Sequence, residues 1–280
     1  KIEDGCDRFC SYCIIPKSRG RVRSKPLDTL KNEIEALANG GIREIVLVGI
    51  NLSAYGKGED FNIVDAVKIC NENEKIKRIR LGSLEPDHLT DEVIEGLASC
   101  EKLCPQFHIS LQSGCNKTLK SMNRHYTAEY KALCTKLRAS FDDASLTTDV
   151  MVGFNDETEA DFNESLDFVK DIAFEKVHVF PYSERVGTAA SKRGDNVSKQ
   201  EKERRAAVMI EETEKIRHNY LESLVNTSKK VLFENEIKPG IYQGYTKSYL
   251  PVRMKYDRNI VGEEIEVKIT NYCDEFCIAE

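Results

Sequence analysis

The chain has 280 residues, of which 40% are hydrophobic and 31% charged, and its formal net charge is −6. This composition is ordinary for a globular protein, and the length allows one large domain and one small one. Without a signal peptide or an apolar run near the roughly 20 residues that span a bilayer, we expect a cytoplasmic protein with no membrane partner. Because the sequence starts at Lys1, inside an expected strand, we interpret it as part of a longer protein.

Short apolar runs alternate with amphipathic helical stretches from residue 1 to about residue 180. The runs are rich in Ile, Val and Leu and are bounded by Gly, Pro, Ser or Asn, a pattern typical of strands. We expect strands at 1–3, 44–48, 78–81, 107–111, 146–152 and 176–180. Strands joined by crossover helices predict a parallel α/β sheet, either doubly wound or closed into part of a barrel.

Polar residues before the helical stretches are expected to cap them. Asp28 precedes one helix, and Thr90 and Thr158 precede two others. Ser198 is expected to begin a charged helix that runs to about residue 224. These capping residues mark the starts of three helices between expected strands and of one helix after the last strand.

An unusual motif directly follows each expected strand. A cysteine cluster follows the first, and the later motifs lie at 49–51, 82–86, 112–114, 153–157 and 181–183. In β/α barrels the working face lies at the carboxyl ends of the strands. The motifs therefore converge on one mouth, which favours a partial (β/α)6 barrel like an incomplete TIM barrel.

After residue 225 the pattern changes to short alternating strands separated by turns, which predicts a small antiparallel β-barrel. We expect a first domain over residues 1–220, linker helix included, and a second over 221–280. Residues 225–280 carry eight basic and nine acidic residues, so their charge does not require RNA binding.

The stretch GCDRFCSYCIIP places Cys6, Cys10 and Cys13 directly after the first expected strand. Thiolates bind zinc or iron–sulfur clusters. Structural zinc usually has four protein ligands, and the later cysteine pairs do not have the spacing of a zinc knuckle. A zinc-stabilised RNA-binding module stays an alternative. A four-iron cluster held by three thiolates leaves one iron open to a cofactor, as reductive cleavage of S-adenosylmethionine requires.

The pattern Cys-x3-Cys-x-aromatic-Cys resembles the radical S-adenosylmethionine (SAM) superfamily. With the segments EIVLVGINLSAYG, RIRLGSLEP, FHISLQSGCNKTLKSMNRHY and TTDVMVGFNDETEADF, the chain resembles the methylthiotransferases of that superfamily. The last 55 or so residues, including GYTKSYLPV, resemble their TRAM domain. The resemblance covers essentially the whole chain.

Among the branches, the chain looks most like the tRNA threonylcarbamoyladenosine methylthiotransferases (MtaB type). That resemblance implies transfer of a methylthio group to carbon 2 of N6-threonylcarbamoyladenosine beside the anticodon. Asn51 stands where this branch often has His, and Lys17 with Ser18 where the family often has Tyr-Ala. The alternatives are isopentenyladenosine in tRNA and an aspartate of a ribosomal protein.

The resemblance also implies site residues. Cys6, Cys10 and Cys13 would hold a [4Fe–4S] cluster, and Tyr12 would line the adenine of SAM. Arg19, Arg21 and Arg23 lie in a basic run just after the cysteines and could meet tRNA phosphates or the threonyl carboxylate of the substrate, although such runs are usually solvated loops.

Further cofactor contacts are implied at the ends of two later strands. Gly49 and Asn51 match the place where the superfamily binds the methionine amine, with a plain strand-ending turn as the alternative. Gln112, Ser113 and Arg124 could hold the ribose and carboxylate, although Arg124 could equally form a structural ion pair.

In this family a second [4Fe–4S] cluster sits on an N-terminal domain, so we expect it only in the full-length protein. This polypeptide alone should bind one cluster and cleave SAM without completing sulfur insertion. The implied partners are tRNA and a reductant protein such as flavodoxin or ferredoxin.

Overall fold

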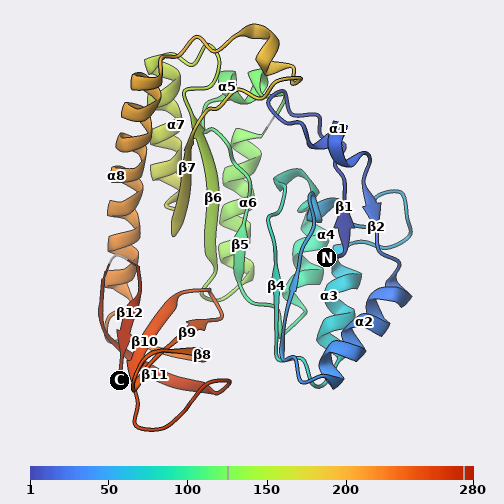
Figure 1. Cartoon of the computed structure of the whole chain (residues 1–280), viewed down its shortest axis with the longest axis vertical. Helices are drawn as coiled ribbons and strands as arrows, with labels where there is room; N and C mark the ends of the chain where they lie inside the picture. The colour runs from blue at the N-terminus through green and yellow to red at the C-terminus, as the bar shows by residue number, and fades with distance from the viewer. Residues whose placement is uncertain (125, 274) are drawn as a thin grey trace.

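The computed structural model describes residues 1–124, 126–273 and 275–280 (Figure 1). A large α/β unit forms the upper part of the view, and a small barrel lies at the lower left beneath helix α8. In the described part of the chain, no helix is both long and apolar enough to cross a membrane.

The large unit is a half-open barrel of parallel strands. Its strands are β1 (Glu3–Asp4), β3 (Glu44–Leu47), β4 (Arg78–Leu81), β5 (Gln106–His108), β6 (Ser145–Val152) and β7 (Lys176–Pro181), and β2 (Arg23–Ser24) pairs antiparallel with β1. β3 pairs with β4, and β5, β6 and β7 form a second parallel group. Isolated parallel bridges, Ile79 with Leu103 and Leu84 with Ile109, join the two groups. The expected partial barrel is confirmed.

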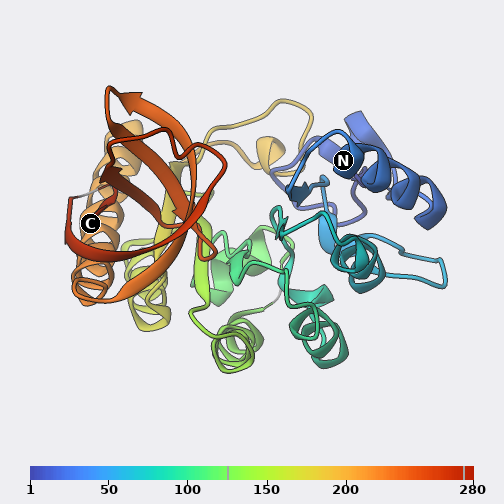
Figure 2. The same cartoon turned by 90° about the horizontal axis from the view of Figure 1, so that it is seen from below.

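Helices form the outer arc of this barrel, as the view from below shows (Figure 2). They are α1 (Ile15–Arg19), α2 (Leu27–Asn39), α3 (Ile63–Glu72), α4 (Asp91–Ala98), α5 (Asn116–Ser121), α6 (Thr127–Ser140), α7 (Glu159–Ile172) and α8 (Lys199–Ser223), with short 3-10 helices η1 (Leu52–Ala54), η2 (Pro86–His88) and η3 (Ala190–Arg193). Apart from α1, which buries no residue, the α-helices pack their apolar faces against the outward side chains of the strands in one continuous core. The inward side chains face the lumen, and two of them near the amino ends of the strands, Arg78 and Arg80, contact the small barrel.

The expected helix caps are mostly present. Thr90, Thr158 and Ser198 each accept a hydrogen bond from the backbone N–H three residues later, and Thr158 belongs to a full capping box. The expectation for Asp28 is wrong. Helix α2 begins at Leu27, directly after Pro26, so Asp28 lies in its first turn, where a carboxylate still favours the helix dipole.

The small barrel closes in the order β10-β12-β11-β8-β9. Its strands are β8 (Ser228–Lys238), β9 (Ile241–Thr246), β10 (Pro251–Lys255), β11 (Glu264–Tyr272) and β12 (Cys277–Ala279). The pairs are antiparallel as expected, except that β10 and β12 run parallel. A closed ring with an odd number of strands cannot alternate direction all the way round, so one pair must be parallel. Val231, Phe233 and Val252 lie in a core of its own.

Two arginines of β4 join the barrels. Arg78 and Arg80 are 1% and 4% exposed, and both reach the small barrel. Arg78 pairs with Glu264 at 2.5 Å and donates to the carbonyl of Tyr245 at 2.9 Å. The small barrel is thereby held at the amino ends of the large barrel's strands, opposite the mouth (Figure 1).

Arg80 forms hydrogen bonds with the turn that links β9 to β10. It donates to the carbonyls of Lys247 and Thr246 at 2.8 and 2.9 Å, and to the carboxylate of Glu44 at 2.8 Å. Each guanidinium nitrogen of both arginines thus donates to a main-chain oxygen or a carboxylate. We call residues 245–250, which these two side chains hold, the docked turn.

Candidate functional site

The cysteine loop, residues 5–13, lies at the carboxyl end of β1, in the upper part of Figure 1. Gly5 has a φ of +90°, and a Cβ there would clash with the backbone of Arg21. The loop can therefore pass close to the backbone of residues 20–21, just before β2, where the Cys6 N–H donates to the carbonyl of Gly20 at 3.0 Å. The Cys13 N–H donates to the Cys10 carbonyl at 3.0 Å, which folds the second half of the loop into a turn.

The three thiols of the loop are free and differ in exposure. Cys10 is buried, whereas Cys6 and Cys13 are half-buried. Burial, and then the proximity of Cys10, raise the pKa values of the Cys6 and Cys13 thiols. Metal binding would have to remove these protons, as it does at thiolate sites generally.

The geometry fits a cluster better than a single ion. Within the described ranges, no group of three His, Cys, Asp or Glu side chains converges closely enough to hold one metal ion. In a four-iron cluster each thiolate binds a different iron, so the sulfurs need not meet at a point. Cys6, Cys10 and Cys13 supply that donor set, on one short loop at the mouth of the barrel.

Arg124 lies behind the loop and is 3% exposed. Its Nη1 donates to the Sγ of Cys10 at 3.2 Å, and its Nη2 pairs with Glu85. Its Nε donates to the hydroxyl of Tyr126. One buried cation therefore links a cysteine of the loop to the end of β4 and to α6, which makes it a positioning residue for the loop.

Arg8 was missed by the sequence reasoning, although it stands inside the cysteine motif. It bonds both carboxylate oxygens of Asp87, at 2.5 and 2.7 Å, and lies 3.4 Å from Glu85. Glu85 therefore sits between two guanidinium groups, those of Arg8 and Arg124. Two features of the sequence could have indicated the role of Arg8. Arg8 follows the first expected strand, Glu85 follows the third, and the carboxyl ends of these strands meet at the same mouth.

Residues 49–51 wrap around the carboxylate of Glu3. The Asn51 N–H donates to Glu3 Oε2 at 2.7 Å, and a Cβ on Gly49 would come within 2.6 Å of the same oxygen. Glu3 is 2% exposed, and burial raises the pKa of its carboxyl. Glu3 Oε1 and Asn51 Oδ1 are both buried without a hydrogen-bond partner in the described structure. These unpaired oxygens support the prediction of polar cofactor contacts here.

Gln112 and Ser113 differ in placement. Gln112 has a φ of +70° and continues the register beside β6, with its N–H on the Asp149 carbonyl. Ser113 is fully buried, and its hydroxyl contacts Ser165 of α7 and accepts from the Cys115 N–H. Gln112 is therefore the better placed of the two for a cofactor, and the hydroxyl of Ser113 serves the packing of α7.

Tyr12 packs at the edge of a small apolar cluster. Its ring meets Phe154 edge-on at 6.1 Å, within a group that includes Met122, Tyr182 and Ala190. Burial raises the pKa of Tyr12 well above its ordinary value. The ring thus offers an apolar wall next to the cysteines, which is compatible with the predicted contact to adenine.

Arg19, Arg21 and Arg23 are exposed beside the cysteine loop. Arg21 lies over the ring of Phe9 and 3.5 Å from Asp7, and Arg23 lies 3.6 Å from Asp4. Such exposed pairs are weak, so these cations can exchange partners when an anionic ligand arrives.

The inward side of the barrel combines titratable groups with large apolar side chains that the sequence reasoning did not single out. Val46, Val48 and Phe180 are large apolar side chains with 51%, 38% and 49% exposure. His108 lies 3.3 Å from Asp149. Alternation along the strands puts these side chains on the face opposite the helices, so they line the lumen below the cysteine loop.

Comparisons with known proteins identify the superfamily of the chain. Residues 2–169 match the family model described as the radical SAM superfamily. The chain therefore belongs to the radical SAM superfamily. Membership implies a [4Fe–4S] cluster and SAM as cofactors.

Two groups of curated relatives are similar. The chain is 36% identical over 281 residues to the threonylcarbamoyladenosine tRNA methylthiotransferase MtaB of Thermotoga maritima, covering 100% of this chain and 64% of that protein. It is 40% identical over 269 residues to a tRNA-2-methylthio-N(6)-dimethylallyladenosine synthase of Endomicrobium trichonymphae, covering 96% and 64%. The chain thus spans just under two thirds of the length of these relatives, and both types are about equally close.

Solved structures support the fold alone. Coproporphyrinogen III oxidase (HemN) of Escherichia coli has a TM-score of 0.56 at 16% identity, over 79% of this chain and 59% of that one. The radical SAM methyltransferase TsrM of Kitasatospora setae has a TM-score of 0.54 at 14% identity, over 86% and 41%.

Proposed function

We propose that this chain is the radical SAM part of a tRNA methylthiotransferase that acts on carbon 2 of N6-threonylcarbamoyladenosine beside the anticodon. The observation that carries the proposal is the three-cysteine loop at the barrel mouth, backed by Arg124, in a chain whose relatives are named as tRNA methylthiotransferases. When bound, the cluster and SAM would supply the radical that removes the hydrogen from carbon 2.

The chain's own residues would bind and position the cluster and SAM. Cys6, Cys10 and Cys13 would hold the cluster, and Arg124 fixes the position of Cys10 through its contact with the thiol. Tyr12 would line the adenine, while Gly49 and Asn51 would contact the methionine part. The apolar side chains of the lumen exclude water from the reacting atoms, as radical chemistry requires.

The substrate assignment rests on the chemistry of the modified base. Threonylcarbamoyladenosine carries a carboxylate, which isopentenyladenosine lacks. Exposed Arg19, Arg21 and Arg23 stand beside the cysteine loop, and guanidinium groups bind carboxylates in a bidentate manner. Isopentenyladenosine in tRNA and an aspartate of a ribosomal protein are the alternative substrates.

Nucleoside mass spectrometry of tRNA from cells with and without the intact gene tests the substrate. We expect methylthio-threonylcarbamoyladenosine alone to disappear. Loss of the methylthio derivative of isopentenyladenosine, or no change in tRNA, would reject this substrate in favour of one of the alternatives.

A second experiment tests the cofactor content of this chain. After anaerobic reconstitution we expect one [4Fe–4S] cluster, hence about four iron atoms per chain, and formation of 5′-deoxyadenosine with a reductant such as flavodoxin or ferredoxin. We infer that a second cluster and full sulfur insertion belong to the longer protein. About eight iron atoms, or full turnover, would contradict this division, and a colourless protein that binds zinc would instead favour the RNA-binding module.

A further inference from the structure

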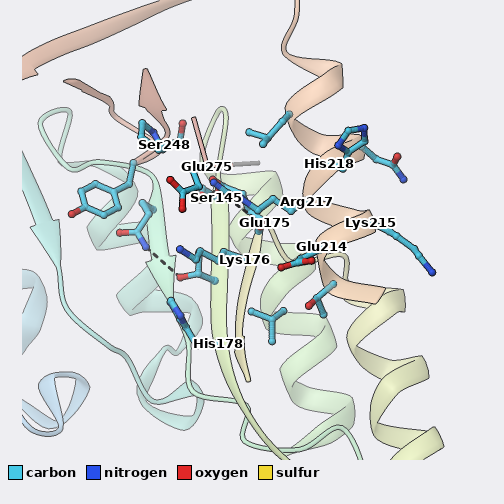
Figure 3. A pocket seen from close by; sticks show the side chains of 18 of the residues that line it. Ser145, Glu175, Lys176, His178, Glu214, Lys215, Arg217, His218, Ser248 and Glu275 are labelled. Carbon is cyan, nitrogen blue, oxygen red and sulfur yellow. Dashed lines mark hydrogen bonds and ion pairs between the residues drawn. The ribbon is translucent and has the colours of Figure 1, made fainter. Parts of the chain in front are cut away.

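A cavity of about 1040 Å³ lies at the end of the large barrel opposite the cysteine loop (Figure 3). Its walls come from the lower halves of β5, β6 and β7, from α8, and from the small barrel. His178 and Lys176 point into it from β7, and Ser248 faces it from the docked turn. The cavity therefore joins the lumen to the surface of the small barrel.

Two tyrosines of the docked turn form a flat aromatic wall of this cavity. The rings of Tyr245 and Tyr249 are stacked, with centroids 4.8 Å apart and planes at 16°. The guanidinium carbon of Arg80 lies 4.7 Å from the centre of the Tyr249 ring. Although it has both neighbours, Tyr249 keeps 50% of its surface exposed. The ring is thus held in a fixed orientation and still accessible from the cavity.

The backbone of Tyr249 is in a conformation that its residue type disfavours. Its φ is +64°, in the left-handed region, and its N–H donates to the Thr246 carbonyl at 3.1 Å to close the turn. Glycine or asparagine is usual at such a position, because a bulky side chain is strained there. Strain of this kind at an accessible side chain points to a function for that side chain.

We propose that the stacked pair Tyr245–Tyr249 is a platform on which a nucleobase of the RNA substrate stacks. An oriented, half-exposed aromatic ring is the feature that holds unpaired bases in RNA-binding proteins. Lys176, which lines the cavity, can meet a phosphate beside that base. Lys215 pairs with Glu211 and Glu212, and Glu175, Glu214 and Glu275 also line the cavity. The inference rests on the proposed function, because it requires RNA as the substrate.

The platform serves a neighbour of the modified nucleotide, not that nucleotide itself. The docked turn lies near the start of β6, where the Ser248 hydroxyl is 3.5 Å from Asp143. Strand β6 has eight residues, and at roughly 3.3 Å per residue it separates the docked turn from the mouth by about 25 Å. The target base must reach the mouth, near the cysteine loop. The platform therefore holds a base several nucleotides away from the modified one. It thereby selects which RNA loop can bind with its target base at the mouth.

The test uses this chain and a single-stranded RNA with the sequence of an anticodon loop, in which 2-aminopurine replaces one base at a time. Stacking on a tyrosine should quench 2-aminopurine at one position only. Tyr249→Asn removes the ring while keeping a residue that tolerates positive φ, so the fold should be retained. We expect RNA affinity to fall roughly five- to a hundredfold, the quenching to disappear, and Tyr249→Phe to restore both.

Tyr256→Asn is the matched control, because Tyr256 also carries an arginine, Arg258, over its ring but does not line the cavity. It should leave affinity and quenching unchanged. Tyr245→Leu, at a position without backbone strain, gives a second removal of a ring and should also weaken binding.

RNA binding that Tyr249→Asn and Tyr245→Leu leave unchanged overturns the platform and leaves the proposed function standing. An equal loss in Tyr256→Asn also overturns it, since the effect would then belong to the small barrel in general. A wild-type chain that binds a peptide at this cavity but no RNA, even at low salt, refutes the proposed function together with the platform.

Discussion

The two ends of the large barrel both contain buried arginines, but they use them differently. At the mouth, Arg124 contacts the thiol of Cys10 and the carboxylate of Glu85. At the opposite end, Arg78 and Arg80 donate to main-chain carbonyls of the docked turn and to the carboxylates of Glu264 and Glu44.

Buried polar atoms without hydrogen-bond partners give a further comparison of the two ends of the barrel. Near the mouth, Glu3 and Asn51 each keep a buried oxygen without a hydrogen-bond partner in the described structure. Unpaired buried polar atoms are costly, and in native proteins they commonly mark a place where a ligand completes the hydrogen bonding. The mouth is therefore organised to receive cofactors, whereas the buried arginines of the lower end join the two barrels beside the cavity. Glu44 Oε2 at that end is also buried without a hydrogen-bond partner in the described structure.

The largest expected effect is at the mouth. Cys10→Ser removes one of the three thiolates and should abolish the iron–sulfur absorption and the retained iron of the reconstituted chain. Cys273→Ser is the control, because Cys273 lies in the small barrel and is partly exposed. Iron analysis and visible absorption measure both. If Cys10→Ser retained the full iron content, the cluster would have to be held elsewhere.

At the lower end, Arg80→Ala should lower the free energy of unfolding by about 3–5 kcal/mol, because Glu44 and two carbonyls lose a buried partner. Arg258→Ala is the control. Arg258 pairs with Glu263 on the surface, and losing an exposed pair should cost less than about 1 kcal/mol. Urea unfolding measures both. Similar small losses in the two variants would show that the docked turn does not depend on Arg80.

A pH-dependent effect is expected from Glu175, at the beginning of β7. It is 7% exposed, and burial raises the pKa of its carboxyl from 4.5 to about 8. Between these values the folded chain keeps a proton that the unfolded chain has released, so stability should fall as the pH rises from about 4.5 to 8. The fall is at most about 1.4 kcal/mol per pH unit.

Glu175→Gln, which cannot ionise, should flatten this part of the stability curve. Urea unfolding at several pH values from 5 to 8 gives the difference between the two proteins, in which the contributions of other groups cancel. A difference that stays constant with pH would mean that Glu175 ionises in the folded chain as it does in water.

The smallest expected effects compare one glycine from each region. An added Cβ on Gly244 meets the backbone of Leu232 in the small barrel, whereas one on Gly49 meets the side chain of Glu3 at 2.6 Å. Backbone cannot move aside as a side chain can, so Gly244→Ala should destabilise by about 1–3 kcal/mol and Gly49→Ala by less. Thermal unfolding measures both, and the reverse order would show that Glu3 is held more firmly than the strand pair.

Much of the large barrel could be predicted from the sequence. The strand at 78–81 has the bounds that were expected, and Thr158 caps its helix as expected, because a strand pattern and an N-cap depend on residues a few positions apart. The cysteine loop could be assigned for the same reason. Its ligands lie within eight residues of one another in the chain.

The sequence by itself determined the order of strands and helices, the cysteine loop and the presence of a second, smaller barrel. Only the tertiary structure decided that Arg78 and Arg80 are buried against a turn more than 160 residues away, that Glu175 loses contact with water, and that Tyr249 faces a cavity. Burial and the choice of partner depend on segments distant in the chain, and a local pattern carries no information about them.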